Sequence, residues 1–183
     1  MSIDIHLRDG ICELRLNAPP GNVIDRETAV ALTAAVREHS HDPHLKAFLL
    51  TAAGAHFSYG ASVPEHVAAQ VDKFLPAFHD LFIALDDAAI PTIAAVQGLC
   101  LGGAFELVAF CDLILAEEDV RFAVPEIALG VFPPAACVFL PWKVGGAVAQ
   151  DLILTGRRMD VEEGLRCGFV SRTCPAGSLH ALT

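Results

Sequence analysis

The stretch AVQGLCLGGAFELVAFCDLILAEEDVRFAVPEIALGVFP, residues 95–133, decides how the rest of the chain is interpreted. It reads as a strand, a glycine-containing turn, a short helix and two further strands. Two lone carboxylates, Glu106 and Glu126, lie among its apolar residues. A carboxylate buried without partners costs several kcal/mol or takes up a proton. These two side chains therefore either reach water or belong to a site that needs carboxyl groups in a dry place.

The chain is strongly hydrophobic, with 54% apolar residues in 183 and a mean hydropathy of +0.49. Its longest uncharged runs, residues 88–105 and 127–142, are interrupted by glycine or proline. Neither run is the unbroken apolar span of about 20 residues that crosses a membrane. The segment MSIDIHLRDG also lacks the regions of a signal peptide. We therefore expect a cytoplasmic protein without a membrane partner, whose apolar surface is buried in the core and against other subunits.

Charge and cysteine content restrict the partners further. The formal net charge of −10 leaves no basic face for a nucleic acid. Arg157 and Arg158 form one local basic pair, which either meets a phosphorylated ligand or lies on a solvated face. The six cysteines show no CxxC spacing, which predicts free thiols in a reducing compartment. The histidines of HSHDPH, residues 39–44, lie at a polar helix end without fixed geometry, and we expect no metal there.

Hydrophobic periodicity predicts one α/β domain over residues 1–183, with strands and helices mixed throughout. The chain opens with two strands, IDIHL and ICELRL, joined by a hairpin turn at Asp9-Gly10. Asp25 is the predicted N-cap of the first helix, and the buried strand LKAFLLTA follows that helix.

The second half continues the same alternation. A helical region is predicted over residues 65–87, bent or broken near Pro76. Strands follow at PTIAAVQG, CDLILAEE and VRFAVPEIALG, with a short helix beginning at Gly102. Helices are predicted over residues 144–155 and 161–167, and no linker or repeat divides the chain.

Three segments combine into a possible site for chemistry: HFSYGAS (56–62), LGGAFE (101–106) and VPEIALG (124–130). Glycines in the first two segments allow turns whose backbone amides point outward, and the second turn also begins a helix. Two amides can hold one oxygen atom while two carboxyl groups move protons beside it. This equipment stabilises an enolate formed from a thioester.

Simpler interpretations exist for each feature. The glycines can serve close packing, Glu106 can lie on an exposed helix face, and Glu126 can face solvent at a strand end. His56 and His66 bracket the first glycine turn and either line a pocket or play an ordinary surface role. GLCLGG lacks the G-x-G-x-x-G spacing of a dinucleotide site. The hydroxyls of HFSYGAS lack the G-x-S-x-G elbow of a serine nucleophile.

Taken together, the sequence resembles the crotonase family, the enoyl-CoA hydratases and isomerases. The resemblance runs through NAPPGNVID, HFSYGAS, residues 95–133 and TGRRMDVEEGLRCGFVSR, which is nearly the whole chain. It implies a spiral of repeated strand-strand-helix units that binds acyl-CoA and assembles as a trimer or hexamer. Family members continue past the point where this chain stops, so we expect the C-terminal helical trimerisation region to be missing.

The resemblance also implies roles for individual residues. The backbone amides of Ala61 and Gly103 would form an oxyanion hole for the thioester carbonyl. Glu106 would activate the attacking water, and Glu126 would exchange a proton with a substrate carbon. The remaining expected substrate-binding residues are Ser58, Tyr59, Gly60, Ser62, Gly102, Phe132 and Pro134. No metal and no cofactor are expected, because coenzyme A is part of the substrate.

Two departures from the family pattern point to an unusual acyl group. Ser62 stands where aspartate is common, and FPPAAC, residues 132–137, stands where glycines are usual. Pro134 has no N–H, so an amide at that position is lost and we expect a stiffer, bulkier loop. HFSYGASVPEH with GVFPPAA is most similar to the cyclic dienoyl-CoA hydratases of anaerobic aromatic degradation, which act on cyclohexa-1,5-diene-1-carbonyl-CoA. The alternatives are an isomerase or hydrolase on the same scaffold, or a catalytically idle assembly subunit.

Overall fold

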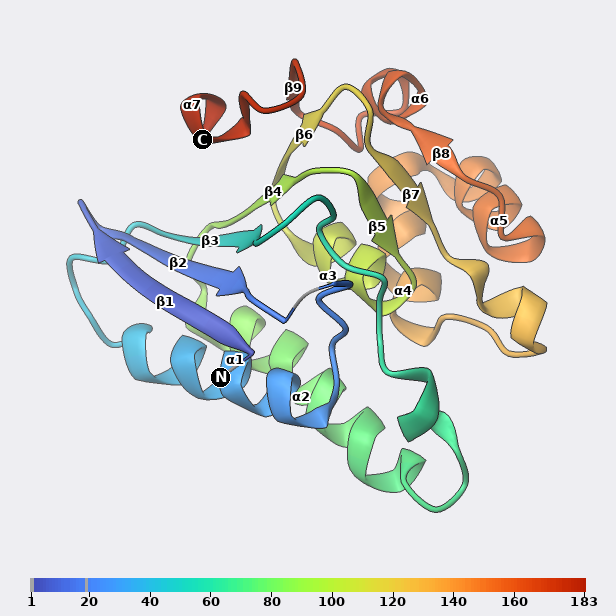
Figure 1. The fold of residues 1–183 in the computed structure, drawn as a ribbon, viewed down its shortest axis with the longest axis horizontal. Helices are drawn as coiled ribbons and strands as arrows, with labels where there is room; N and C mark the ends of the chain where they lie inside the picture. The colour runs from blue at the N-terminus through green and yellow to red at the C-terminus, as the bar shows by residue number, and fades with distance from the viewer. Residues whose placement is uncertain (1, 19) are drawn as a thin grey trace.

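The computed structural model describes residues 2–18 and 20–183. Within them, the strands form a six-stranded sheet of order β1-β2-β3-β4-β6-β9 and a three-stranded sheet of order β5-β7-β8 (Figure 1). The larger sheet contains β1 (Ile3–Arg8), β2 (Ile11–Leu16), β3 (Ala47–Ala52), β4 (Thr92–Val96), β6 (Leu113–Glu117) and β9 (Arg172–Cys174). The smaller sheet contains β5 (Leu99–Leu101), β7 (Arg121–Ala123) and β8 (Met159–Asp160).

The helices lie around these sheets. The two longest, α1 and α2, run side by side below the larger sheet in Figure 1. The α-helices are α1 (Arg26–His39), α2 (Val71–Ala88), α3 (Gly103–Phe110), α4 (Pro134–Val144), α5 (Gly146–Thr155), α6 (Val161–Arg166) and α7 (Leu179–Leu182). Two 3₁₀ helices, η1 (Val63–His66) and η2 (Pro125–Leu129), follow strand ends. No helix in the described ranges is long and apolar enough to span a bilayer.

The chain winds as a spiral in which a strand of the larger sheet is followed by one of the smaller sheet and then by a helix. β4, β5 and α3 form one turn, and β6, β7 and η2 begin the next. An isolated parallel bridge between Ser58 and Cys100 adds the segment after β3 to the smaller sheet. The predicted fold of repeated strand-strand-helix units is therefore confirmed.

The N-terminal predictions are also confirmed. β1 and β2 pair antiparallel, and their turn places Asp9 and Gly10 at φ +53° and +84°, as a tight hairpin requires. Asp25 caps α1 by accepting a hydrogen bond from the Thr28 amide at 2.8 Å. The parallel strands begin with the pairing of β2 and β3.

Two predictions about helices are wrong. The helical region over residues 65–87 is interrupted at residues 67–70, between η1 and α2, whereas Pro76 lies inside α2. Pro76 is exposed near the start of that helix, so water can replace the backbone bond that it removes. The predicted FPPAAC loop is instead the beginning of α4. Pro134 is its first residue, a position that suits the fixed φ of proline.

Gly145, at φ +80°, separates α4 from α5, so the helix predicted over residues 144–155 begins two residues later. The core behind α3 contains three fully buried rings, Phe105, Phe122 and Phe169, with centroids 5.1–5.4 Å apart. This aromatic cluster packs the α3 helix against the spiral, and α3 carries Glu106.

Candidate active site

The spiral brings three loops together because each follows one of three neighbouring parallel segments. Ser58 pairs in parallel with Cys100 of β5, and β5 pairs in parallel with β7. The residues that follow these segments are Tyr59 to Ala61, Gly102 to Gly103, and Val124 to Glu126. Carboxyl ends of parallel strands meet at one edge of a sheet, where ligands of α/β proteins commonly bind. The topology therefore gathers the three predicted segments at one edge.

The two glycine turns are in direct contact. Gly60 has φ +102°, and a Cβ there would lie 2.5 Å from the Leu101 carbonyl oxygen. A Cβ on Gly103 would lie 2.9 Å from Cβ of Ala61 and 3.3 Å from its amide nitrogen. Only glycine allows this close approach. The backbone amides of Ala61 and Gly103 are therefore neighbours in space.

Both amides are available to a ligand. Ile24 bonds to the residues on either side of Ala61, since its amide donates to the Gly60 carbonyl and its carbonyl accepts from Ser62. Gly103 is the first residue of α3 and its N–H has no acceptor inside that helix. No hydrogen bond from the Ala61 or Gly103 amide is found within residues 2–18 and 20–183. Two such donors at a helix start favour an oxygen that carries negative charge.

A cavity of about 460 Å³ opens beside these amides. Its lining includes Ala61, Gly103, Glu106 and Glu126. The surrounding wall is mostly apolar and comes from η1, the start of α2 and residues 129–134. The cavity thus places the two predicted carboxyl groups and the two amides around one space.

Glu106 is a buried carboxyl group, with only 5% of the residue exposed. Its Oε1 accepts a hydrogen bond from the Ala136 amide at 2.8 Å. Burial raises the pKa of Glu106 to about 7, and the negative charge of Glu126 adds to the rise, while the Ala136 amide opposes it. The sequence left open whether Glu106 is exposed or buried; the structure buries it and shows Ala136 as a partner that the sequence analysis missed. Pro134 lacks an N–H, and the amide two residues further on in α4 is directed at the carboxyl group instead.

Glu126 is half-buried on η2, and its Oε2 is buried without a hydrogen-bond partner among the described residues. A Cβ on Gly102 would lie 2.9 Å from its Oε1, so this carboxyl group lies directly over the second glycine turn. Burial raises the pKa of Glu126, and its own backbone amide and the charge of His66 partly offset that rise. The charge of Glu126 raises the pKa of Glu106, so the proton affinities of the two carboxyl groups are linked.

The other residues expected to bind substrate divide into two groups. Tyr59, Gly102, Phe132 and Pro134 line the cavity.

Ser58, Gly60 and Ser62 are not part of the cavity lining. Ser58 is fully buried, and its hydroxyl donates to the Asn22 carbonyl at 2.7 Å and accepts from the Gly60 amide at 3.0 Å. Its hydrogen bonds therefore fix the turn that presents Ala61, and the geometry gives no support for direct substrate contact. Gly60 is packed against Leu101, and Ser62 is buried with 7% exposed.

Asn22 is a supporting residue that sequence analysis missed. Its side-chain amide donates to the carbonyls of Ala53, His56 and Phe57 at 2.8–3.1 Å. The motif NAPPGNVID contains this residue, but its contacts span more than thirty positions of sequence and cannot be assigned from local spacing. Asn22 anchors the loop that leads to the first glycine turn.

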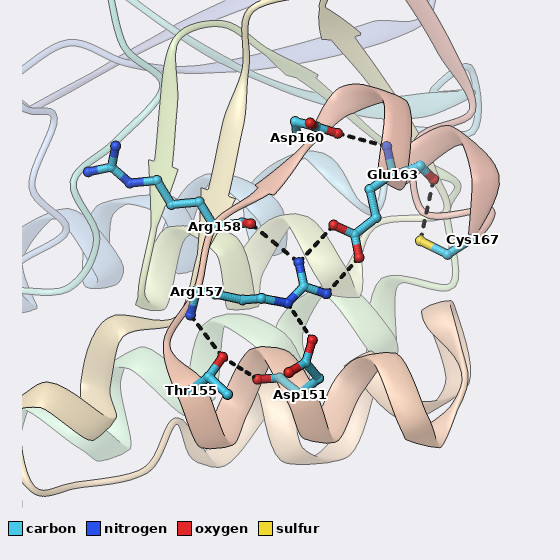
Figure 2. Close-up of polar contacts among 8 residues, drawn as sticks. Asp151, Thr155, Arg157, Arg158, Asp160, Glu163 and Cys167 are labelled. Carbon is cyan, nitrogen blue, oxygen red and sulfur yellow. Dashed lines mark hydrogen bonds and ion pairs between the residues drawn. The ribbon is translucent and has the colours of Figure 1, made fainter.

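Of the basic pair, Arg157 is held in a structural cluster of ion pairs. Figure 2 shows the Arg157 guanidinium between Asp151 and Glu163, with two bonds of 2.6 and 2.7 Å to the Glu163 carboxylate. This contact lowers the pKa of Glu163 and joins α5 to α6. Arg158 is exposed, and its side chain points away from the cluster in Figure 2. No group of three or more metal-ligating side chains occurs in the described residues, the HSHDPH histidines included.

The spiral fold, the paired amides and the two carboxyl groups define one class of protein, and comparison with known proteins agrees. The family model described as enoyl-CoA hydratase/isomerase matches residues 6–182, and the chain belongs to this crotonase family. It is 44% identical over 164 residues to cyclohexa-1,5-dienecarbonyl-CoA hydratase of Thauera aromatica, covering 89% of this chain and 64% of that protein. It is 38% identical over 169 residues to the probable enoyl-CoA hydratase echA8 of Mycobacterium tuberculosis, covering 91% and 66%.

The chain therefore spans about two thirds of the length of these relatives. Among solved structures, DspI of Pseudomonas aeruginosa superimposes with a TM-score of 0.94 at 30% identity, covering 99% of this chain and 71% of that one. An enoyl-CoA hydratase subunit of Geobacillus kaustophilus gives a TM-score of 0.91 at 31% identity, covering 100% and 72%.

Proposed function

We propose that this chain carries the active site of an acyl-CoA hydratase, which adds water to a carbon–carbon double bond conjugated with a thioester carbonyl. The supporting observation is a pair of carboxyl groups with raised pKa values beside two unengaged amides in one cavity. Hydration needs a base for the water and an acid for the carbon, and a pair that shares one proton supplies both. Coenzyme A enters as part of the substrate, and the proposal requires no further cofactor and no metal.

The proposed reaction places the thioester oxygen against the amides of Ala61 and Gly103. Glu106 takes a proton from water while the water oxygen bonds to the β-carbon, and the π electrons move onto the thioester oxygen as an enolate. The two amides stabilise that negative charge. Glu126 then gives its proton to the α-carbon and the carbonyl re-forms. Glu106 gains one proton and Glu126 loses one, so the total charge of the two carboxyl groups is unchanged. The product is therefore the substrate plus one molecule of water.

We further propose that the acyl group is cyclohexa-1,5-diene-1-carbonyl, handled in anaerobic degradation of aromatic compounds. The name of the 44% identical relative supports this choice. The cavity wall also carries Phe132, Pro133 and Pro134, which make it stiff and apolar on the side where the chain departs from the family pattern.

The test is a direct comparison of crotonyl-CoA and the cyclic diene with the purified protein. Incorporation of ¹⁸O from labelled water into the product distinguishes hydration from isomerisation, which adds no water. A kcat/KM at least tenfold higher for the cyclic diene supports the specific proposal. A preference for crotonyl-CoA would contradict the cyclic substrate. Products without ¹⁸O would contradict the hydratase proposal.

We also propose that the enzyme assembles as a homo-oligomer, a trimer or hexamer, in the cytoplasm. Large apolar side chains on α4 and α5 are unusually exposed, with Trp142 at 89% and Leu154 at 69%. The six cysteines are all free thiols, as suits a reducing compartment. Light scattering after size exclusion measures the mass, and a monomer at micromolar concentration contradicts the assembly.

A further inference from the structure

His66 is a polar side chain in the cavity that the reaction above does not use. It ends η1 and lines the same space as Glu126. Its Nδ1 lies 2.7 Å from the Ser62 carbonyl oxygen, and its ring lies 4.8 Å from that of Phe74. A carbonyl oxygen only accepts, so Nδ1 carries a hydrogen and Nε2 is the ring nitrogen left for the cavity. The imidazole is therefore held in one orientation.

His66 is also the one lining residue that can become positively charged, since the other titratable side chains there are Tyr59, Glu106 and Glu126. Histidine changes its charge between pH 5 and 8, the range in which raised carboxyl groups titrate. The positive imidazole lowers the pKa of Glu126 against the effect of burial. A protonated imidazole thus adds a charge of the opposite sign to the cavity that the two carboxyl groups line.

Other charged residues lie nearby on the elements packed against η1. They are Glu65 on η1, Arg26 at the start of α1, and Asp72 and Lys73 at the start of α2. Glu65 accepts a hydrogen bond from the Arg26 amide at 2.8 Å. None of the four lines the cavity, so none is placed as His66 is to act on the pair directly.

We propose that His66 is a positioning residue for the proton shared by Glu106 and Glu126, because its positive charge opposes uptake of a second proton by the pair. This role rests on the proposed hydratase function. When both carboxyl groups are protonated, no base is present to activate water. When neither is protonated, no acid is present to protonate the carbon, so only the singly protonated pair is active. A protonated imidazole at this position keeps the singly protonated state of the carboxyl pair populated to lower pH.

The proposal predicts opposite effects for two substitutions. His66→Gln removes the charge of a protonated imidazole, so the acid limb of the kcat/KM profile moves to higher pH. We expect a shift of about 0.5 pH unit, because exposed charges are screened by solvent and salt. The alkaline midpoint of His66→Gln should stay in place, because a neutral imidazole adds no charge there. His66→Arg has a permanent charge, so its alkaline limb should move to lower pH.

The matched control is Lys73→Gln, which removes a neighbouring cation outside the cavity and should move neither limb. Thermal unfolding of each variant establishes that it is folded. If His66→Gln lowers activity equally at every pH and leaves both midpoints in place, His66 has only a structural role and the proposal fails.

A second readout separates this inference from the hydratase proposal. Carboxyl ¹³C chemical shifts of Glu106 and Glu126, followed by NMR in the free protein, report their titration without turnover. The midpoint should rise in His66→Gln and stay in place in Lys73→Gln. If the protein hydrates no acyl-CoA but the midpoint still rises, the hydratase proposal is rejected and the role of His66 is supported. If the enzyme is active but the midpoint does not rise in His66→Gln, only the proposed role of His66 is rejected.

Discussion

The amide of Ala136 donates to Oε1 of Glu106 at 2.8 Å, so the N-terminus of α4 holds the carboxyl group that projects from α3. A helix N-terminus favours negative charge, and burial of the same group disfavours it. The balance leaves the pKa of Glu106 at about 7 rather than far above neutrality. A carboxyl group in this range can both accept and release a proton at physiological pH.

Removal of either acid–base group should reduce turnover strongly. We expect Glu106→Gln and Glu126→Gln each to lower kcat by about 10²–10⁴-fold, the usual contribution of a positioned acid or base. Binding of the coenzyme A ester should change little, because glutamine has nearly the same shape as glutamate. Steady-state kinetics gives kcat, and calorimetric titration with a product ester gives the affinity. Near-normal turnover in one variant would exclude that residue from the mechanism.

The same burial predicts a pH-dependent stability gain in Glu106→Gln. The folded-state pKa of about 7 lies above the ordinary value of 4.5, so folding favours the protonated form. The stability from this group is therefore complete below pH 4.5 and is lost as pH rises through 7. A rise of this size corresponds to roughly 3 kcal/mol lost above pH 7. Glutamine cannot ionise and avoids the loss.

Denaturant unfolding at pH 5 and pH 8 checks this expectation. The variant should be more stable than the unmodified protein at pH 8 and about equal to it at pH 5. An equal difference at both values would mean that ionisation of Glu106 is not its cause.

The sequence predicts the parts of this site that depend on neighbouring residues, but not the contacts between residues far apart in the chain. The glycine turns and both glutamates carry local signals, since glycine at a strand-to-helix turn and a carboxylate in an apolar run are visible within a few residues. Ala136 carries no such signal, because any residue except proline supplies the same N–H. Its partner is thirty positions away and is selected by the packing of α4 on α3.

Ser58 shows how a long-range contact changes the interpretation of a local signal. The family resemblance implied that Ser58 contacts substrate, whereas the structure buries its hydroxyl, which bonds to the Asn22 carbonyl and the Gly60 amide. The break between η1 and α2 escaped prediction for a related reason. Proline is a local signal, whereas the end of η1 at His66 leaves no comparable mark in the sequence.

The space beside Gly102 gives a sharper test of the position of Glu126. Gly102→Ala introduces a Cβ that would lie 2.9 Å from Oε1 of Glu126, so the carboxyl group must move. Because φ is +51° at this position, the variant also carries backbone strain. Gly168→Ala is the matched control, since φ is +79° there and, apart from its chain neighbours, no atom of the described residues lies within 4 Å of the added Cβ.

Both variants should lose stability, by about 1 kcal/mol from strain. Only Gly102→Ala should also lose kcat, by about tenfold or more, because displaced catalytic groups react slowly. Comparable kcat losses in the two variants, measured well below their unfolding temperatures, would show that strain rather than displacement of Glu126 lowers the rate.

The last prediction returns to the start of α4. Ala136→Pro removes the N–H that Glu106 accepts, at a position in the first helical turn where proline costs no intrahelical bond. Loss of that bond removes an interaction that lowers the pKa of Glu106, so its pKa should rise above 7. The rate optimum should then move to higher pH, because the base form of Glu106 appears only there. Ala136→Gly keeps the N–H and serves as the control for a change of side chain at this buried position. A pH–rate profile that is unchanged in Ala136→Pro would show that the N-terminus of α4 does not set the proton affinity of Glu106.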